Sequence, residues 1–159
     1  MPKIALILSD FDFQIGAWRV KHRRLKERLL DCTEWEEFDG TSQMRPILGG
    51  NGNIEDNVIQ FSSGTYKAIA LRSFDAASKN WAIWWLSSAA PHTLDVPVIG
   101  RFANGIGSFF ADDILRDKPV RVRFLWLRTD TEQPRWEQAM SSDGGQTWET
   151  NWTMDFTRA

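Results

Sequence analysis

Apolar stretches of strand length follow one another along most of the chain, and turn-forming residues separate them. Long helical periodicity is scarce. This pattern is typical of an all-β sandwich or barrel. We predict ten strands, at residues 17–26, 34–45, 53–61, 66–74, 80–87, 97–103, 106–112, 119–128, 134–141 and 147–157.

The connecting segments have the composition of tight turns between neighbouring strands. Residues 49–53 (Gly-Gly-Asn-Gly-Asn), 62–64 (Ser-Ser-Gly) and 104–105 (Asn-Gly) tolerate positive φ or form side-chain-stabilised turns. They predict hairpins. About ten strands joined in this way favour an antiparallel up-and-down β-barrel, because closure removes the exposed edges of an open sheet. A sandwich is the alternative.

Residues 23–30 are the ambiguous segment of this prediction. They contain good helix formers and a leucine pair at i, i+4, which favours a helix. The apolar positions also change parity within the segment, so a continuous strand would need a bulge near residues 24–25. We prefer a strand here and keep the helix as the alternative.

The first strand predicts polar groups inside the barrel. If Trp18 faces inward, strand alternation turns Val20, His22 and Arg24 inward as well. A histidine and an arginine inside a small barrel need partners, because burial of an unpaired polar group is costly. His22 is also the best candidate for acid–base catalysis, with Arg24 as an anion-stabilising group, since imidazole titrates near neutral pH. A structural imidazole is the simpler interpretation of His22.

The remaining candidate ligand contacts come from the other strands. The last strand alternates Trp148, Thr150, Trp152, Met154 and Phe156 against polar residues, which predicts its inward face. Strands 80–87 and 119–128 leave open whether Trp84 or Trp85, and Arg123 or Trp126, face inward. Arg72, Arg101 and Arg123 are possible inward cations, although a surface charge on the outer face is the simpler interpretation of each. Glu37 and Glu137 are candidate partners for the inward cations. The predicted ligand-binding residues are Trp18, Val20, Glu37, Arg72, Trp85, Arg123, Glu137, Trp152 and Met154.

Residues 141–148 (Ser-Ser-Asp-Gly-Gly-Gln-Thr-Trp) match the Asp-box pattern Ser-x-Asp-x-Gly-x-Thr-Trp. That motif recurs in the propeller blades of sialidase-like proteins. It is a self-contained turn in which Asp143 can accept backbone hydrogen bonds and the glycines adopt unusual φ. Because the motif occurs once in a short chain, it predicts a hairpin here and is weak support for glycosidase chemistry.

The N-terminal residues resemble those of lipocalins. Residues 11–15 (Phe-Asp-Phe-Gln-Ile) followed by Gly-Ala-Trp at residues 16–18 are similar to the 3₁₀ plug and Gly-x-Trp of that family. The resemblance implies a calycin-like barrel whose Trp18 points inward at the closed end. It also implies a basic residue late in the last strand lying across that ring, for which Arg158 is the candidate.

The same N-terminal stretch and two others are similar to uncharacterised bacterial proteins with lipocalin-like barrels. They are residues 11–18, residues 35–41 (Trp-Glu-Glu-Phe-Asp-Gly-Thr) and the Gly-rich turn at residues 49–52. The resemblance implies a fold and no established activity. We expect one lipocalin-like domain over residues 1–159, with residues 1–16 forming an N-terminal arm and plug.

The charge and the cysteine content indicate which classes of partner and which cellular compartment to expect. The net charge is −2, and the six Lys and Arg between residues 19 and 28 are not interleaved with aromatics, so we expect no nucleic-acid partner. One cysteine is compatible with a reducing compartment. The apolar run at residues 4–8 is too short for a signal sequence or a membrane span, so we expect a cytoplasmic protein with no membrane partner.

Motifs for several chemistries are missing from the sequence. Two histidines in unlike contexts and one cysteine give no convincing metal site, and the Gly-rich turn lacks the features of a phosphate loop. There is no Gly-x-Ser-x-Gly elbow. We expect no cofactor, although His22 as a haem ligand stays open.

Nine Trp and ten Phe stand beside one Tyr, a composition that suits an apolar cavity. The first hypothesis is therefore a barrel that binds a small, largely apolar or aromatic metabolite, with His22 and Arg24 at its polar end. The second is a barrel enzyme of the cyclase or isomerase type that uses the same two residues. The third is a barrel that serves for protein–protein contact, as in a homodimer.

Overall fold

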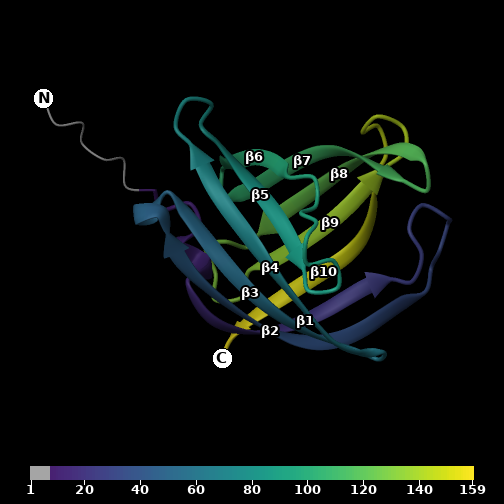
Figure 1. Ribbon diagram of the computed structural model, residues 1–159, viewed down its shortest axis with the longest axis horizontal. Coiled ribbons are helices and arrows are strands. Elements are labelled where there is room, and N and C mark those ends of the chain that lie inside the picture. Colours follow the sequence, from purple (N-terminus) through teal and green to yellow (C-terminus); the bar gives the residue numbers. More distant parts are fainter. Residues whose placement is uncertain (1–7) are drawn as a thin grey trace, which may run out of the picture.

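Ten antiparallel strands form one closed barrel in the computed structural model, which describes residues 8–159 (Figure 1). Each strand pairs with the next one in sequence, and β1 pairs with β10 to close the barrel. The predicted up-and-down barrel is thus confirmed, and the sandwich alternative is wrong. The strands are β1 Gly16–Leu25, β2 Trp35–Ile47, β3 Gly52–Phe61, β4 Gly64–Asp75, β5 Asn80–Ser87, β6 Val98–Ala103, β7 Ile106–Leu115, β8 Lys118–Leu127, β9 Arg135–Ser141 and β10 Glu149–Arg158.

The segment at residues 23–30 is strand only as far as Leu25. Its pairing with β2 runs without a shift to Leu25 opposite Trp35, so the predicted bulge near residues 24–25 is absent from this pair. The chain then continues as an irregular loop in which Leu29 and Asp31 have positive φ. Such φ values interrupt a right-handed helix, and the helix alternative is wrong.

The bulge lies instead in β10, where the pairing with β9 shifts between Thr150 and Trp152. The inserted residue reverses the alternation, so the inward face predicted for Trp148 and Thr150 is wrong. Trp148 precedes β10 and packs against Phe110 on the outer face. Trp152, Met154 and Phe156 do face inward and are buried, as predicted.

The predicted Asp-box hairpin joins β9 to β10. Asp143 accepts hydrogen bonds from the backbone N–H groups of Gln146 and Thr147, at 3.0 and 2.9 Å, and from the Ser141 hydroxyl. These bonds hold the pKa of Asp143 far below its usual range, because they stabilise the carboxylate. The motif is a turn device in this protein.

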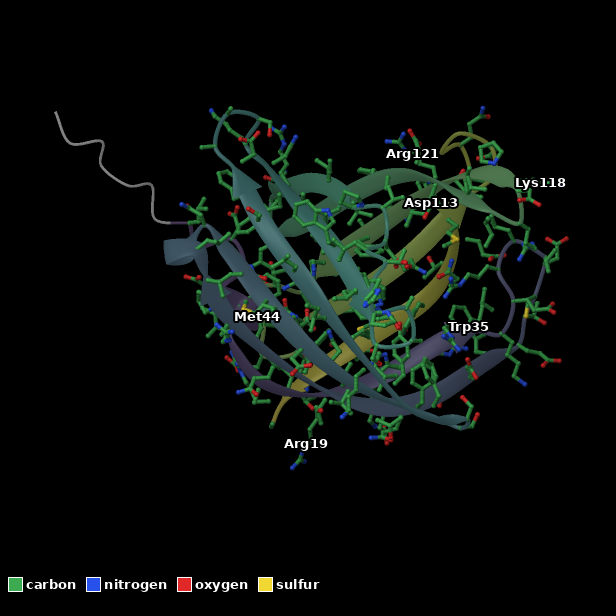
Figure 2. The ribbon with its side chains drawn as sticks, in the orientation of Figure 1. Arg19, Trp35, Met44, Asp113, Lys118 and Arg121 are labelled. Carbon is green, nitrogen blue, oxygen red and sulfur yellow. The ribbon has the colours of Figure 1, made fainter. Side chains whose placement is uncertain are left out.

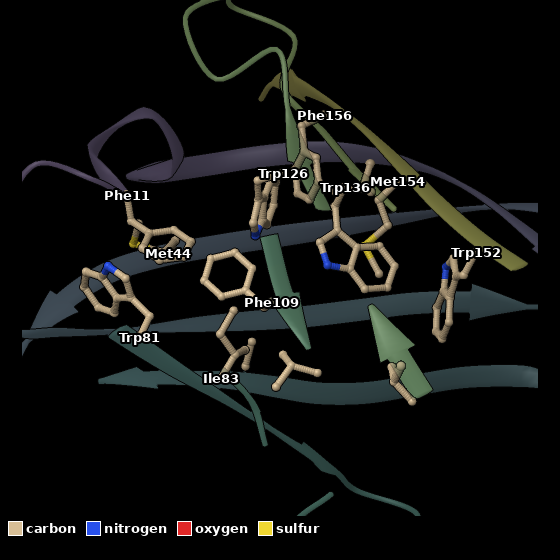
Figure 3. Close-up of a cluster of buried hydrophobic side chains, with 14 of the residues drawn as sticks. Phe11, Met44, Trp81, Ile83, Phe109, Trp126, Trp136, Trp152, Met154 and Phe156 are labelled. Carbon is tan, nitrogen blue, oxygen red and sulfur yellow. The ribbon is translucent and has the colours of Figure 1, made fainter. Parts of the chain in front are cut away.

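A short 3₁₀ helix, η1 (Asp12–Gln14), closes one end of the barrel. Beside it the Phe11 ring makes edge contacts with Trp81 and Phe102, both at 4.9 Å between ring centroids. Figure 3 shows the core extending from Phe11 and Trp81 to Trp152. The loops that join β1 to β2, β7 to β8 and β9 to β10 lie at the opposite end from η1 (Figure 1).

The closed end has the arrangement that the family resemblance implied. Trp18 is buried and donates its indole N–H to the Gln14 carbonyl at 2.8 Å. The Arg158 guanidinium lies 3.8 Å from the centroid of the Trp18 ring, which confirms the predicted cation–π contact. Gly16 is required here because its φ is +114° and a Cβ would lie 2.8 Å from Arg158 Nη1.

The outer face is charged, and Arg19 projects from it away from the barrel wall (Figure 2). Within the described residues we find no helix of the length and hydropathy needed to cross a bilayer. The apolar run at residues 4–8, interpreted above as too short for a signal sequence, lies outside the described residues except for Leu8.

Candidate functional site

A cavity of about 270 Å³ lies inside the barrel, toward the end opposite η1. Aromatic rings form most of its wall, and they come from β3, β4, β5, β8, β9 and β10. Polar groups stand among them. The lining residues are Phe61, Tyr66, Trp85, Phe124, Trp136, Trp152 and Met154, with Arg24, Arg28, Ser87, Asp95 and Gln138.

Strand alternation explains which residues reach the cavity. In β5 Trp85 lines the cavity, so Trp85 and not Trp84 is the inward residue. In β8 Phe124 and Trp126 face inward, so Arg123 faces outward, where its guanidinium stacks 4.6 Å from the Trp148 ring. The structure therefore does not place Arg123 at the predicted ligand site.

The aromatic wall is held by ring contacts and a polar tether. Trp152 makes edge contacts with Trp85 and Trp136, at 6.5 and 6.0 Å between centroids. The Trp85 indole N–H donates to the Tyr66 hydroxyl at 3.2 Å. These contacts orient the rings before any ligand enters, which lowers the entropy cost of binding.

Arg24 reaches the cavity as predicted, but its carboxylate partner is a different residue. Its Nε and Nη2 donate to one Glu36 oxygen at 3.0 and 2.6 Å, and its guanidinium lies 4.4 Å from the Phe61 ring. Glu37 faces outward, because it has the opposite parity on β2, and lies 3.6 Å from Arg23. The predicted inward position of Glu37 is therefore wrong.

Arg28 is a lining residue that the sequence did not indicate. It belongs to the loop between β1 and β2, where no strand period predicts the direction of a side chain. Burial lowers its pKa, and the nearby charge of Arg24 lowers it further, whereas Asp95 and Tyr66 act in the opposite sense. The positive charges of Arg24 and Arg28 thus repel each other at the mouth of the cavity.

His22 faces inward as predicted but does not line the cavity itself, and it lies behind Trp152, which does. Its exposed fraction is 2%, its ring stacks on Phe38 at 5.0 Å, and its Nδ1 accepts the Trp152 indole N–H at 3.1 Å. Burial lowers its pKa to about 4, with Arg24 contributing. The imidazole is therefore neutral at pH 7 and its Nδ1 lone pair is occupied.

A Cβ at Gly40 would lie 3.0 Å from His22 Nε2, so the glycine provides the space for the ring. These contacts make His22 a packed structural residue and a poor fit to a haem ligand facing the cavity.

A second polar cluster lies deeper in the barrel, around Arg72. This buried residue pairs with Glu55 and donates to Asn53 Oδ1 at 2.9 Å, and the Ser42 hydroxyl donates to the other Glu55 oxygen at 2.7 Å. Arg72 therefore faces inward, and the outer-face position, the simpler interpretation from the sequence, is wrong for this residue. A space of only about 20 Å³ adjoins it, which is room for about one water molecule.

The other predicted site residues fall into three groups. Trp85, Trp152 and Met154 line the cavity together. Trp18 and Val20 face inward as predicted but belong to the core and are not lining residues. Glu137 faces outward and lies 3.6 Å from Arg135, so its expected role as an interior partner is wrong.

Residues 8–159 contain no group of three or more His, Cys, Asp or Glu side chains placed to hold a metal ion. Comparison of the chain with protein-family models and with curated proteins gives no match.

Proposed function

We propose that the protein binds a small, largely apolar or aromatic molecule inside its barrel, in the manner of lipocalin-like proteins. The observation that carries the proposal is the cavity of about 270 Å³ with a wall of preoriented aromatic rings. Its volume is close to the lower end of the usual range for ligand pockets, which suits a molecule of one or two rings.

The lipocalin-like part of the proposal is supported at the closed end of the barrel. A 3₁₀ plug, an inward Trp18 and the Arg158 guanidinium across its ring occur together there, as the resemblance implied. A barrel sealed at one end leaves the opposite end for ligand entry.

Acid–base chemistry by His22 and Arg24 has weaker support. The pKa of His22, about 4, leaves the ring without a proton to donate near neutral pH. Trp152 occupies its Nδ1, and Arg24 is bound to Glu36. We therefore restrict the proposal to binding.

The experiment is a titration of the purified protein with a panel of small aromatic and apolar metabolites, followed by tryptophan fluorescence and thermal shift. Trp85, Trp136 and Trp152 line the cavity, so a ligand there should quench emission and raise Tm. Ser87→Phe, which fills the cavity, should abolish both effects. Leu86→Phe, at the neighbouring position of the opposite strand parity, should leave them unchanged.

The proposal fails if no compound alters either signal in the wild-type protein. It also fails if Ser87→Phe, folded as judged by circular dichroism, binds the panel as well as the wild-type protein does.

A further inference from the structure

Three arginines face the spaces inside the barrel, and they differ in their partners. Arg24 is bound to Glu36 and Arg72 is bound to Glu55. Arg28 lines the cavity, yet it forms no ion pair with any carboxylate among residues 8–159. Asp95 lines the same cavity and acts on Arg28 through its charge, but it forms no hydrogen bond or ion pair with the guanidinium. A partly buried guanidinium without a hydrogen-bonded anion is costly, and a bound anion would relieve that cost.

The backbone around Arg28 is fastened on two sides. The Arg28 carbonyl accepts a hydrogen bond from Arg116, and the N–H of the next residue, Leu29, donates to Glu149 Oε1 at 2.8 Å. These contacts attach the loop between β1 and β2 to the turn between β7 and β8 and to the first residue of β10. The Arg28 side chain is thus carried by an anchored backbone, which favours a defined binding geometry.

The donors that face the cavity favour an anion over a cation, because the Arg24 charge is paired with Glu36 and the Arg28 guanidinium has no hydrogen-bonded carboxylate. Arg24 and Arg28 both line the cavity, and Asp95 is the one carboxylate among the lining residues. Burial raises the pKa of Asp95 and the neighbouring Asp113 raises it further, whereas the charge of Arg28 lowers it. The attraction between the two residues does not compensate Arg28, whose pKa stays below its usual range. Arg28 also offers a planar fork of N–H donors that matches a carboxylate.

We infer that the cavity selects a flat aromatic molecule bearing one anionic oxygen group, with the rings against the aromatic wall and the anion on Arg28. This inference rests on the proposed function and names the ligand class for the same cavity. Arg24, stacked over Phe61, borders the site, but its charge is already paired with Glu36, so Arg28 is the cation left to hold the anion.

The test compares matched pairs that differ only in charge, such as 2-naphthoate and 2-naphthamide, by isothermal titration calorimetry. The wild-type protein should bind the carboxylate about tenfold or more tightly than the amide, since a hydrogen-bonded charge contributes that much. Arg28→Met should remove the preference and leave the affinity for the amide within about twofold. Arg28→Lys should retain part of the preference for the carboxylate.

Arg19→Met is the matched control, because it removes one positive charge from the outer face of β1 and should keep the full preference. Equal affinity for acid and amide in the wild-type protein would overturn the inference and leave the proposed function standing. Equal weakening of both compounds by Arg28→Met would also overturn it, because the side chain would then act through packing. If no member of a series of one- and two-ring pairs binds, the proposed function itself fails.

Discussion

Arg72 and Glu55 show how this barrel accommodates charge in its interior. Their side chains are 3% and 4% exposed, and Asn53 and Ser42 supply the further hydrogen bonds that the pair requires. The guanidinium also lies 4.7 Å from the Phe11 ring. The pair therefore ties β3 and β4 to the plug at the closed end.

Removing one member of this pair should be costly. We expect Glu55→Gln to lower the free energy of unfolding by about 3 kcal/mol, because Arg72 keeps its charge in a buried setting. The double variant Glu55→Gln, Arg72→Met should be less destabilised than Glu55→Gln alone. Urea denaturation measures both. Asp112→Asn, which alters an exposed ion pair with Arg121, should cost less than about 1 kcal/mol.

His22 should make stability depend on pH. Its pKa is about 4 in the folded protein and 6.5 in the unfolded chain, so the unfolded chain takes up the proton first. The contribution is fully present above pH 6.5 and is lost as the pH falls toward 4, by about 3 kcal/mol in all.

Urea unfolding at a series of pH values in this window measures the loss. His22→Gln should flatten the dependence, whereas His92→Gln, at an exposed loop position, should not change it. An unaltered pH profile in His22→Gln would contradict this account.

Among the elements, β6 and β7 depend on a close backbone approach at Gly100. A Cβ at this position would lie 1.8 Å from the Ser108 carbonyl oxygen. We expect Gly100→Ala to lower the free energy of unfolding by about 3 kcal/mol, since the strands would have to separate. The adjacent Ile99→Ala, at an exposed position, should cost about 0.5 kcal/mol. Similar values for the two variants would argue against this contact.

The hairpin between β9 and β10 depends on the hydrogen bonds that the Asp143 carboxylate accepts. Asp143→Ala removes four hydrogen bonds that the carboxylate accepts within the turn and should lower Tm, because the turn fixes the register beside the β10 bulge. Thermal denaturation followed by circular dichroism checks this. Ser142→Ala, at the neighbouring exposed residue, is the control and should leave Tm unchanged.

Strand alternation predicted the elements whose period is unbroken. In β1 it identified the inward face of Trp18, Val20, His22 and Arg24, because pairing runs from Gly16 to Leu25 without a shift. In β10 it failed for Trp148, because a bulge depends on local backbone geometry that a two-residue period does not encode.

The position of Arg28 could not be predicted from strand alternation, because the residue belongs to a loop. Its position depends on where the loop between β1 and β2 is fastened, and those contacts involve Arg116 and Glu149, which are distant in sequence. Glu36, the partner of Arg24, could have been found by applying the same parity to β2, since Phe38 and Ser42 share its inward face.

At the scale of the whole molecule, the barrel is packed with aromatic rings at one end and hollow at the other. The plug, Trp18 and the Arg72 cluster fill the closed end, whereas the wall of Trp85, Trp136 and Trp152 surrounds the cavity. A barrel built only for stability could fill this space with side chains. The hollow half is the reason for proposing a binding protein.

Native mass spectrometry of the purified protein tests this claim most directly. We expect the wild-type protein and Leu86→Phe to carry a small molecule that dissociates on activation, and we expect Ser87→Phe, whose cavity is filled, to carry none. The mass of the released molecule should correspond to a compound of one or two rings that fits about 270 Å³. Retention of the same molecule by folded Ser87→Phe would contradict the account, because the ligand would then lie outside the barrel.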